Sequence, residues 1–231
     1  PLVKLPYVLI TRKEVRRPED LKGKALGIAR AGDLSDRLSR AVVKKLGLAP
    51  DAVTIRPIGG SQGERYQAMA AGIVHGVIIT PPLDVRAKNE GYNVMYRLID
   101  LNIPFIYSSL HTSYKMLRER PDIVQRMVAA LAEIVYFVEK NPDKAKASIG
   151  KAMRTNDQQA LQSAYDVYAR EILDRTMVVP GKAVAETIEL ARQDGAPIRR
   201  KAEEIYDNSF VNNLEKSGFM KEIWGSENYR R

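Results

Sequence analysis

The sequence predicts an α/β fold followed by a mostly helical segment. Apolar, β-branched runs alternate with amphipathic segments of helix length between residues 24 and 98, which is typical of parallel βαβ units. A further apolar run at residues 103–110 ends this alternation, and the pattern after it is almost entirely helical. The length of 231 residues and the hydrophobic fraction of 45% suit one large domain or two small lobes with a buried core.

Each expected strand is a short apolar run bounded by charged or turn-forming residues. These runs are residues 5–11, 24–30, 53–58, 77–80, 93–98 and 103–110. Helices are expected where apolar residues recur at helical spacing between glycine and proline boundaries. They cover residues 18–21 (a single turn), 35–46, 61–73, 83–90, 121–141, 142–151, 157–173 and 182–193, and residues 197–206 stay ambiguous.

Composition excludes several classes of protein. The net charge of +9 comes from basic residues interleaved with acids, without a recognition-helix, RRM or zinc-finger pattern, so no nucleic-acid partner is predicted. Cysteine is absent, which excludes disulfides, thiolate metal sites and a cysteine nucleophile within this chain. The two histidines, His75 and His111, lack closely spaced ligands, so no metal or other cofactor is expected.

The ends of the chain and its apolar stretches give two expectations about processing and membranes. The first residue is Pro1 rather than Met, so we expect either a removed signal peptide or the remainder of a longer protein. The longest apolar stretch, residues 127–138, is too short to cross a membrane and contains Glu133.

Three loops are expected at the carboxyl ends of the strands, which is the edge where open α/β sheets bind ligands. They are residues 30–35, 59–63 and 80–82. The loop containing Gly32, Asp33 and Ser35 leads into a helix N-terminus, which favours an anion or a polar group. Asp33 or Ser35 could equally serve only as the helix N-cap. Hydroxyls and backbone amides, rather than an arginine, are the polar groups expected at this edge.

An enzymatic alternative rests on residues 59–63, GGSQG, which match the G-x-S-x-G nucleophile elbow of α/β-hydrolases. Ser61 would be the nucleophile, and Asp84 or Asp100 and then His111 follow in the order used by those enzymes. Two features weaken this alternative, because only about three strands precede Ser61 and no HGGG-type oxyanion motif lies upstream.

Several short motifs occur in a fixed order along the chain. They are residues 18–24 (PEDLKGK), 31–33 (AGD), 69–77 (MAAGIVHGV), 80–82 (TPP), 120–124 (RPDIV) and 206–210 (YDNSF). Together they resemble the periplasmic solute-binding proteins of ABC importers, in the nitrate/sulfonate/taurine and thiamine-pyrimidine-precursor binding family. His75 departs from that pattern, because it stands where the family usually has an acid.

The resemblance implies a two-lobed type II periplasmic-binding-protein fold with two hinge strands and a first lobe that is incomplete in this chain. The implied domains are residues 1–12 (a hinge strand and remnant of lobe 1), 13–100 (lobe 2) and 101–231 (the return hinge strand and C-terminal helices packing on lobe 1). The ligand-facing positions would be Gly32, Asp33, Ser35, Gly60, Ser61, Thr80, Pro81, Tyr107 and Ser108.

The resemblance also implies a function without bond making. Such a protein is a monomer in the periplasm, or a lipoprotein outside the cytoplasmic membrane, that closes on a small organic solute between its lobes. It then delivers the solute to a permease of an ABC importer in the membrane. The absence of cysteine argues against the Cys-rich, pyrimidine-synthesising branch of the superfamily. An effector-binding sensor domain has the same fold and stays open as an alternative.

Overall fold

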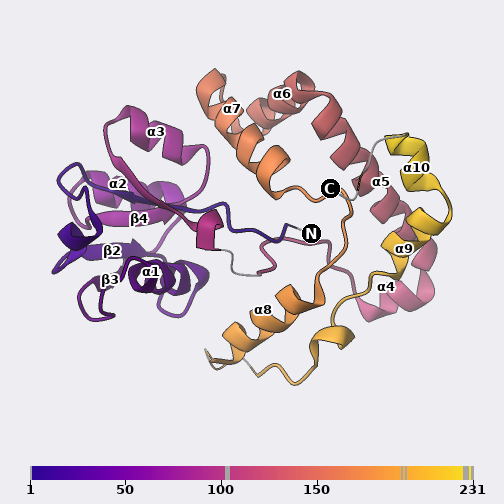
Figure 1. Cartoon of the computed structure of the whole chain (residues 1–231), viewed down its shortest axis with the longest axis horizontal. Helices are drawn as coiled ribbons and strands as arrows, with labels where there is room; N and C mark the ends of the chain where they lie inside the picture. Colours follow the sequence, from indigo (N-terminus) through magenta and orange to yellow (C-terminus); the bar gives the residue numbers. More distant parts are fainter. Residues whose placement is uncertain (1, 102–104, 194, 196, 226–228, 230–231) are drawn as a thin grey trace. The chain divides into compact units, whose positions relative to one another are not determined.

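The computed structural model describes residues 2–101, 105–193, 195, 197–225 and 229, which form two compact units (Figure 1). Unit 2 consists of Leu5–Asn102 and Asn156–Ala164. Unit 1 consists of Pro1–Lys4, Ile103–Thr155 and Tyr165–Arg231. The short segment Asn156–Ala164, which the sequence assigns to the C-terminal helical region, therefore belongs with the α/β part of the chain.

Unit 2 is built on a five-stranded sheet with the order β3-β2-β4-β1-β5. The strands are β1 (Val8–Thr11), β2 (Ala25–Ile28), β3 (Thr54–Pro57), β4 (Gly76–Ile79) and β5 (Asn93–Arg97). Strand β2 pairs in parallel with β3 and β4, whereas β1 lies antiparallel between β4 and β5. All four residues of β1 and of β4 are buried, as expected of central strands that are covered on both faces. The strand expected at residues 5–11 is thus a central member of this sheet.

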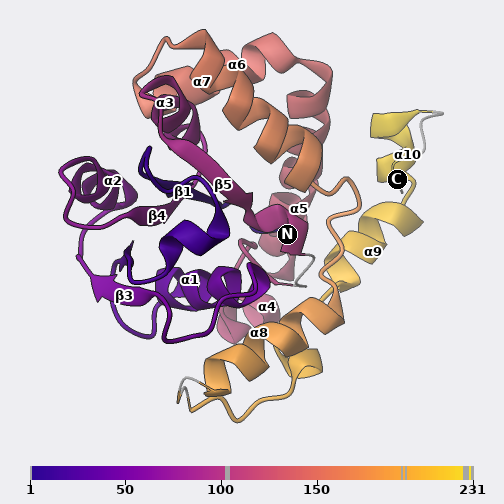
Figure 2. The ribbon, with the colours of Figure 1, turned by 60° about the vertical axis from the view of Figure 1, so that its left-hand side comes forward.

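Helices cover both faces of that sheet. They are α1 (Leu34–Lys45), α2 (Gln62–Ala70) and α3 (Leu83–Asn89). The β2–α1–β3 and β3–α2–β4 connections run in opposite directions across the sheet, so right-handed crossovers place α1 and α2 on opposite faces. Figure 2 shows α1 on one side of the strands and α2 and α3 on the other. The core between the sheet and α2 includes Ile10, Tyr66, Met69 and Val77, all fully buried.

The regular elements in the described residues of unit 1 are helices and helical turns. It contains α4 (Tyr114–Glu119), α5 (Pro121–Lys140), α6 (Pro142–Met153), a π-helical turn (Asp166–Ile172), α8 (Gly181–Gln193), a 3-10 turn (Ala202–Glu204), α9 (Ser209–Lys216) and α10 (Phe219–Trp224). Its core lies where α5 packs against α9 and α10, and includes Ala132, Val135, Leu214, Met220 and Trp224. In the part of the chain that the structure describes, no helix is long and apolar enough to span a membrane.

The strand expected at residues 103–110 is wrong for the described residues 105–110. Only an isolated bridge forms there, in which the Leu2 N–H donates to the Ser108 carbonyl at 2.7 Å and the Tyr107 N–H donates to the Leu2 carbonyl at 2.8 Å. Leu2 also forms an isolated bridge with Leu173. Because both bridges use the same residue, the described residues form no ladder of successive backbone hydrogen bonds, as a strand would require. Residues 103 and 104 lie outside the described residues.

The other expected elements are present, with boundaries shifted by up to three residues. One exception is the helix expected at residues 157–173, which is divided into α7 (Gln158–Tyr165) and the π-helical turn. The sequence did not predict α4, α9 or α10, and the ambiguous stretch at residues 197–206 contains only the 3-10 turn. The helices that the sequence did not predict and the ambiguous stretch all lie in unit 1.

Candidate functional site: the carboxyl edge of the unit 2 sheet

The three predicted loops meet at one edge of the sheet in unit 2. Strands β2, β3 and β4 run in the same direction, so their carboxyl ends are adjacent. The Gly59 N–H donates to the Ala29 carbonyl at 3.1 Å and joins the loops after β2 and β3. The Thr80 N–H and hydroxyl both donate to Gln62 Oε1, at 2.7 and 3.1 Å, and join the loop after β4 to the start of α2.

The first loop is organised around the N-terminus of α1. Asp33 is the N-cap, and its Oδ1 accepts from the Asp36 N–H at 3.0 Å and from the Ser35 hydroxyl at 2.7 Å. Ser35 Oγ in turn accepts from the Ala29 N–H at 2.9 Å, and the Gly32 N–H donates to Asp36 Oδ2 at 2.8 Å. Asp33 therefore fills the capping role that the sequence left open between the two residues, whereas Ser35 links the cap to the end of β2. Ligand contact by either residue stays a prediction.

The second loop is organised around the N-terminus of α2. Ser61 and Glu64 form a capping box, in which the Ser61 Oγ accepts from the Glu64 N–H at 3.3 Å and the Glu64 carboxylate accepts from the Ser61 N–H. That N–H donor lowers the pKa of Glu64 below its ordinary value. Gly60 has φ +67°, and a Cβ there would lie 2.4 Å from Glu64 Oε2, so the capping box requires glycine at this position.

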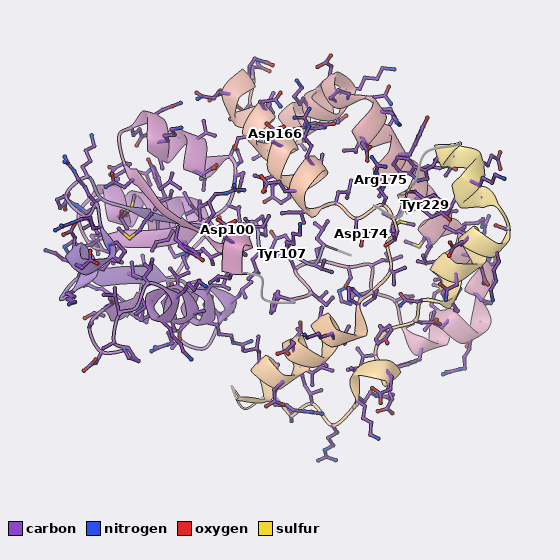
Figure 3. All side chains as sticks on the ribbon, in the orientation of Figure 1. Asp100, Tyr107, Asp166, Asp174, Arg175 and Tyr229 are labelled. Carbon is purple, nitrogen blue, oxygen red and sulfur yellow. The ribbon has the colours of Figure 1, made fainter. Side chains whose placement is uncertain are left out.

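This geometry does not support the hydrolase alternative. A nucleophile elbow holds its serine in a strained turn with a free Oγ, whereas Ser61 has φ −74° and ψ 171° and its Oγ caps α2. The histidine that the triad would need, His111, belongs to unit 1, where its Nε2 lies 3.0 Å from Ser109 Oγ. Asp100 lies in a 3-10 turn (Leu98–Leu101) that follows β5 in unit 2 (Figure 3).

Arg65, in α2, is a charged residue of this edge that the sequence analysis missed. Only 6% of its surface is exposed, and its Nη1 donates to the Gly60 carbonyl at 2.9 Å. Its Nε is buried and has no hydrogen-bond acceptor among the described residues. Burial lowers the pKa of Arg65, and the nearby Asp33 and Tyr7 oppose that shift. The sequence analysis expected hydroxyls and backbone amides rather than an arginine clamp, whereas the structure places a buried arginine at this edge. Contact between Arg65 and a ligand is untested. The sequence feature that could have identified Arg65 is its spacing from Ser61, because a residue four positions after an N-cap lies on the same side of the helix as the cap.

The third loop contains Thr80 and Pro81 and leads to Asp84 at the start of α3. Thr80 is half-buried and Pro81 is buried. Burial raises the pKa of Asp84, while hydrogen bonds from the Val85 N–H and the Ser163 hydroxyl and the charge of Arg97 limit the shift. Asp84 Oδ1 is buried without a hydrogen-bond donor in the described part of the chain.

The structure gathers seven of the nine predicted site residues in unit 2. The other two, Tyr107 (labelled in Figure 3) and Ser108, belong to unit 1. Their backbone groups pair with Leu2. Their predicted contact with a ligand is untested. Across the described ranges, no group of three or more histidine, aspartate or glutamate residues is arranged to hold a metal ion.

The fold is that of solved periplasmic binding proteins. The desulfurization enzyme DszB superposes with a TM-score of 0.69 at 15% identity, covering 94% of this chain and 77% of DszB. The periplasmic aliphatic sulphonate-binding protein SsuA of Escherichia coli gives 0.69 at 16% identity, over 92% of this chain and 72% of SsuA. The alkanesulfonate-binding SsuA of Xanthomonas axonopodis pv. citri, bound to MOPS, gives 0.66 at 16% identity, over 89% and 70%.

These superpositions confirm the predicted fold class. The family follows from comparisons of the sequence. A search of curated proteins found no match. The family model described as "NMT1/THI5 like" matches residues 3–145, which is more than half of the chain. This match confirms the resemblance drawn from the motifs, and the chain belongs to the NMT1/THI5-like family.

Proposed function

We propose that this protein binds a small organic solute at the carboxyl edge of the unit 2 sheet and delivers it to the permease of an ABC importer. The observation that carries this proposal is the joining of three loops and two helix N-termini at one edge. Such an edge offers backbone N–H groups, hydroxyls and positive helix ends, which suit binding of a polar or anionic group.

Three structural relatives support this proposal and its ligand class. SsuA of Escherichia coli is described as periplasmic and as binding aliphatic sulphonates, SsuA of Xanthomonas as bound to MOPS, and a Staphylococcus aureus relative as the ligand-binding component of an ABC-type import system. By this analogy the ligand is a small organic sulfonate, the partner is a membrane permease, and the protein acts outside the cytoplasmic membrane. We further propose that it acts as a monomer.

Calorimetric titration with ethanesulfonate, benzenesulfonate, benzoate and cytosine tests the proposal. We expect saturable binding of at least one sulfonate. Thr80→Val removes the hydroxyl that donates to Gln62 and joins the third loop to α2. The variant is expected to weaken sulfonate binding roughly fivefold, the cost of about one hydrogen bond that orders the edge. Thr54→Val is the matched control, because Thr54 is exposed at the amino end of β3. Absence of binding to every solute, with tight binding of nucleic acid instead, would contradict the proposal.

An enzymatic function is the second candidate, because DszB has this fold. A cysteine-to-serine mutant of DszB was solved with biphenyl-2-sulfinic acid, whereas this chain contains no cysteine. We expect no turnover of that sulfinic acid and no labelling of Ser61 by a fluorophosphonate probe. Turnover of the sulfinic acid, or a labelled Ser61, would favour an enzyme over a binding protein.

A further inference from the structure

Arg65 carries a positive charge that unit 2 buries without fully satisfying it. Its Nη1 has the Gly60 carbonyl as acceptor, but its Nε has none in the described ranges of the chain. Buried donors without an acceptor are rare in folded proteins, because burial costs the donor its bonds to water. An arginine is the most demanding case, since its guanidinium has five N–H donors and stays charged.

The acids closest to Arg65 are engaged elsewhere. Asp33 Oδ1 accepts from Ser35 and Asp36 in the α1 cap, and the Glu64 carboxylate accepts from Ser61 in the α2 cap. Neither acid forms an ion pair with Arg65 within the part of the chain that the structure describes. The carboxylates moderate the local charge without neutralising the guanidinium by direct contact.

The surroundings of Arg65 favour a negative group as the missing acceptor. Helices α1 and α2 both begin at this edge, and their positive dipole ends add to the charge of the guanidinium. We infer that Arg65 is the residue by which unit 2 recognises the charge of its ligand, with a sulfonate or carboxylate oxygen accepting from its guanidinium group. This inference rests on the proposed function and names the charge-recognising residue within it.

Two pairs of probes separate charge recognition from mere binding. Benzenesulfonate and benzenesulfonamide have similar shapes but differ in charge, as do benzoate and benzamide. Wild-type protein is expected to favour each anion over its neutral partner. Arg65→Met is expected to weaken binding of the anions by roughly 10- to 100-fold, the fold-change of one charged hydrogen bond, and to leave binding of the neutral probes almost unchanged.

Asp33→Asn provides a test with the opposite sign. Asparagine is as good an N-cap as aspartate, so α1 keeps its cap while the competing negative charge disappears. Binding of the anions is expected to tighten about two- to fivefold, because the variant removes one carboxylate whose repulsion of the anion is partly screened by solvent. Arg56→Met is the matched control, because Arg56 is exposed on β3 and donates to the Ile73 carbonyl. Thermal unfolding of each variant, with Arg65→Lys as a variant that keeps the charge, verifies that the fold is retained.

The outcomes separate this inference from the proposed function. If wild-type protein binds no probe, the proposed function fails and the inference fails with it. If wild-type protein binds the anions and the neutral probes equally, or if Arg65→Met weakens both equally while the fold is retained, the solute-binding function stands and the inference is overturned. Opposite effects of Arg65→Met and Asp33→Asn on the anions alone would support it.

Discussion

The two units bury their apolar side chains to different extents. In unit 2 the central strand β1 pairs on both sides, and Leu9 and Ile10 are fully buried within it. In unit 1 the helix α5 buries one side against α9 and α10, but Met127 and Ile134 on its other side are 48% and 54% exposed. Unit 2 covers its central apolar strand on both sides, whereas unit 1 leaves one side of an apolar helix uncovered. The cost of shortening an apolar side chain should therefore be high in β1 and low on the exposed side of α5.

The largest expected effect comes from Ile10→Ala. Ile10 is fully buried between β4 and β5, so the variant leaves a cavity and should lower the free energy of unfolding of unit 2 by about 2–5 kcal/mol. Ile134→Ala removes the same atoms from the exposed side of α5 and should change stability by no more than about 0.5 kcal/mol. Urea unfolding followed by circular dichroism measures both. Equal losses in the two variants would contradict the difference between the units.

The same contrast explains how much of the fold could be predicted from the sequence. The strands and helices of unit 2 follow from local patterns, namely apolar runs that end at glycine, proline or charge. The placement of β1 between β4 and β5 could not be predicted, since pairing between residues as distant as Val8 and Ile79 leaves no local signal. In unit 1 the apolar run at residues 103–110 suggested a strand, but among the described residues Ser108 forms a bridge with Leu2 alone. Short helices such as α4 and α10, of six residues each, are too brief for a periodic pattern.

An intermediate effect is expected from Glu139→Gln in unit 1, where a partly buried ion pair supports the core. Arg175 donates to both carboxylate oxygens of Glu139, through Nε at 2.7 Å and through Nη2, and lies 4.7 Å from the centre of the Trp224 ring (Figure 3). The side chains of the pair are 24% and 28% exposed. Loss of this charged acceptor should destabilise unit 1 by about 1.5–3 kcal/mol, measured by thermal unfolding.

The matched control lies in the same unit. Arg170 and Asp166 form a pair at 2.9 Å, but their side chains are 64% and 39% exposed. Asp166→Asn should therefore cost at most about 1 kcal/mol, because water and salt screen an exposed pair. A loss as large as that of Glu139→Gln would show that burial does not determine the strength of ion pairs in unit 1.

The candidate site was predictable to the extent that it depends on loops. Parallel strands end at one edge, so the loops containing Gly32, Gly60 and Thr80 could be expected to meet. The role of each side chain could not be predicted from the sequence. Asp33 and Ser61 are residue types that suit a helix N-cap and a ligand contact equally well, and only their hydrogen-bond partners in the structure distinguish the two roles. Arg65 was missed for a related reason, since its spacing from Ser61 places it near the edge but its burial depends on the fold of the loop at Gly60.

The smallest expected effect, and the one that depends on pH, comes from Asp84→Asn in unit 2. Burial raises the pKa of Asp84 above its ordinary value of 3.8, so the folded protein keeps a proton that the unfolded chain has already lost. The stability of unit 2 should therefore fall as the pH rises from 3.8 through the raised pKa, and the loss should persist at neutral pH. Asp84→Asn removes this penalty and should stabilise the unit at pH 7 by up to about 1 kcal/mol, with less effect at pH 3.

Asp20 provides the control of opposite sign. Its carboxylate accepts from the backbone N–H groups of Arg17 and Arg16, which lowers the pKa of Asp20 below 3.8. This contribution to stability is present above pH 3.8 and is lost as the pH falls through the lowered pKa, so Asp20→Asn should destabilise the unit at neutral pH. Unfolding midpoints between pH 3 and 7 separate the two variants. Shifts of the same sign would mean that burial is not the dominant influence on Asp84, and that this carboxylate is stabilised by its donors as Asp20 is.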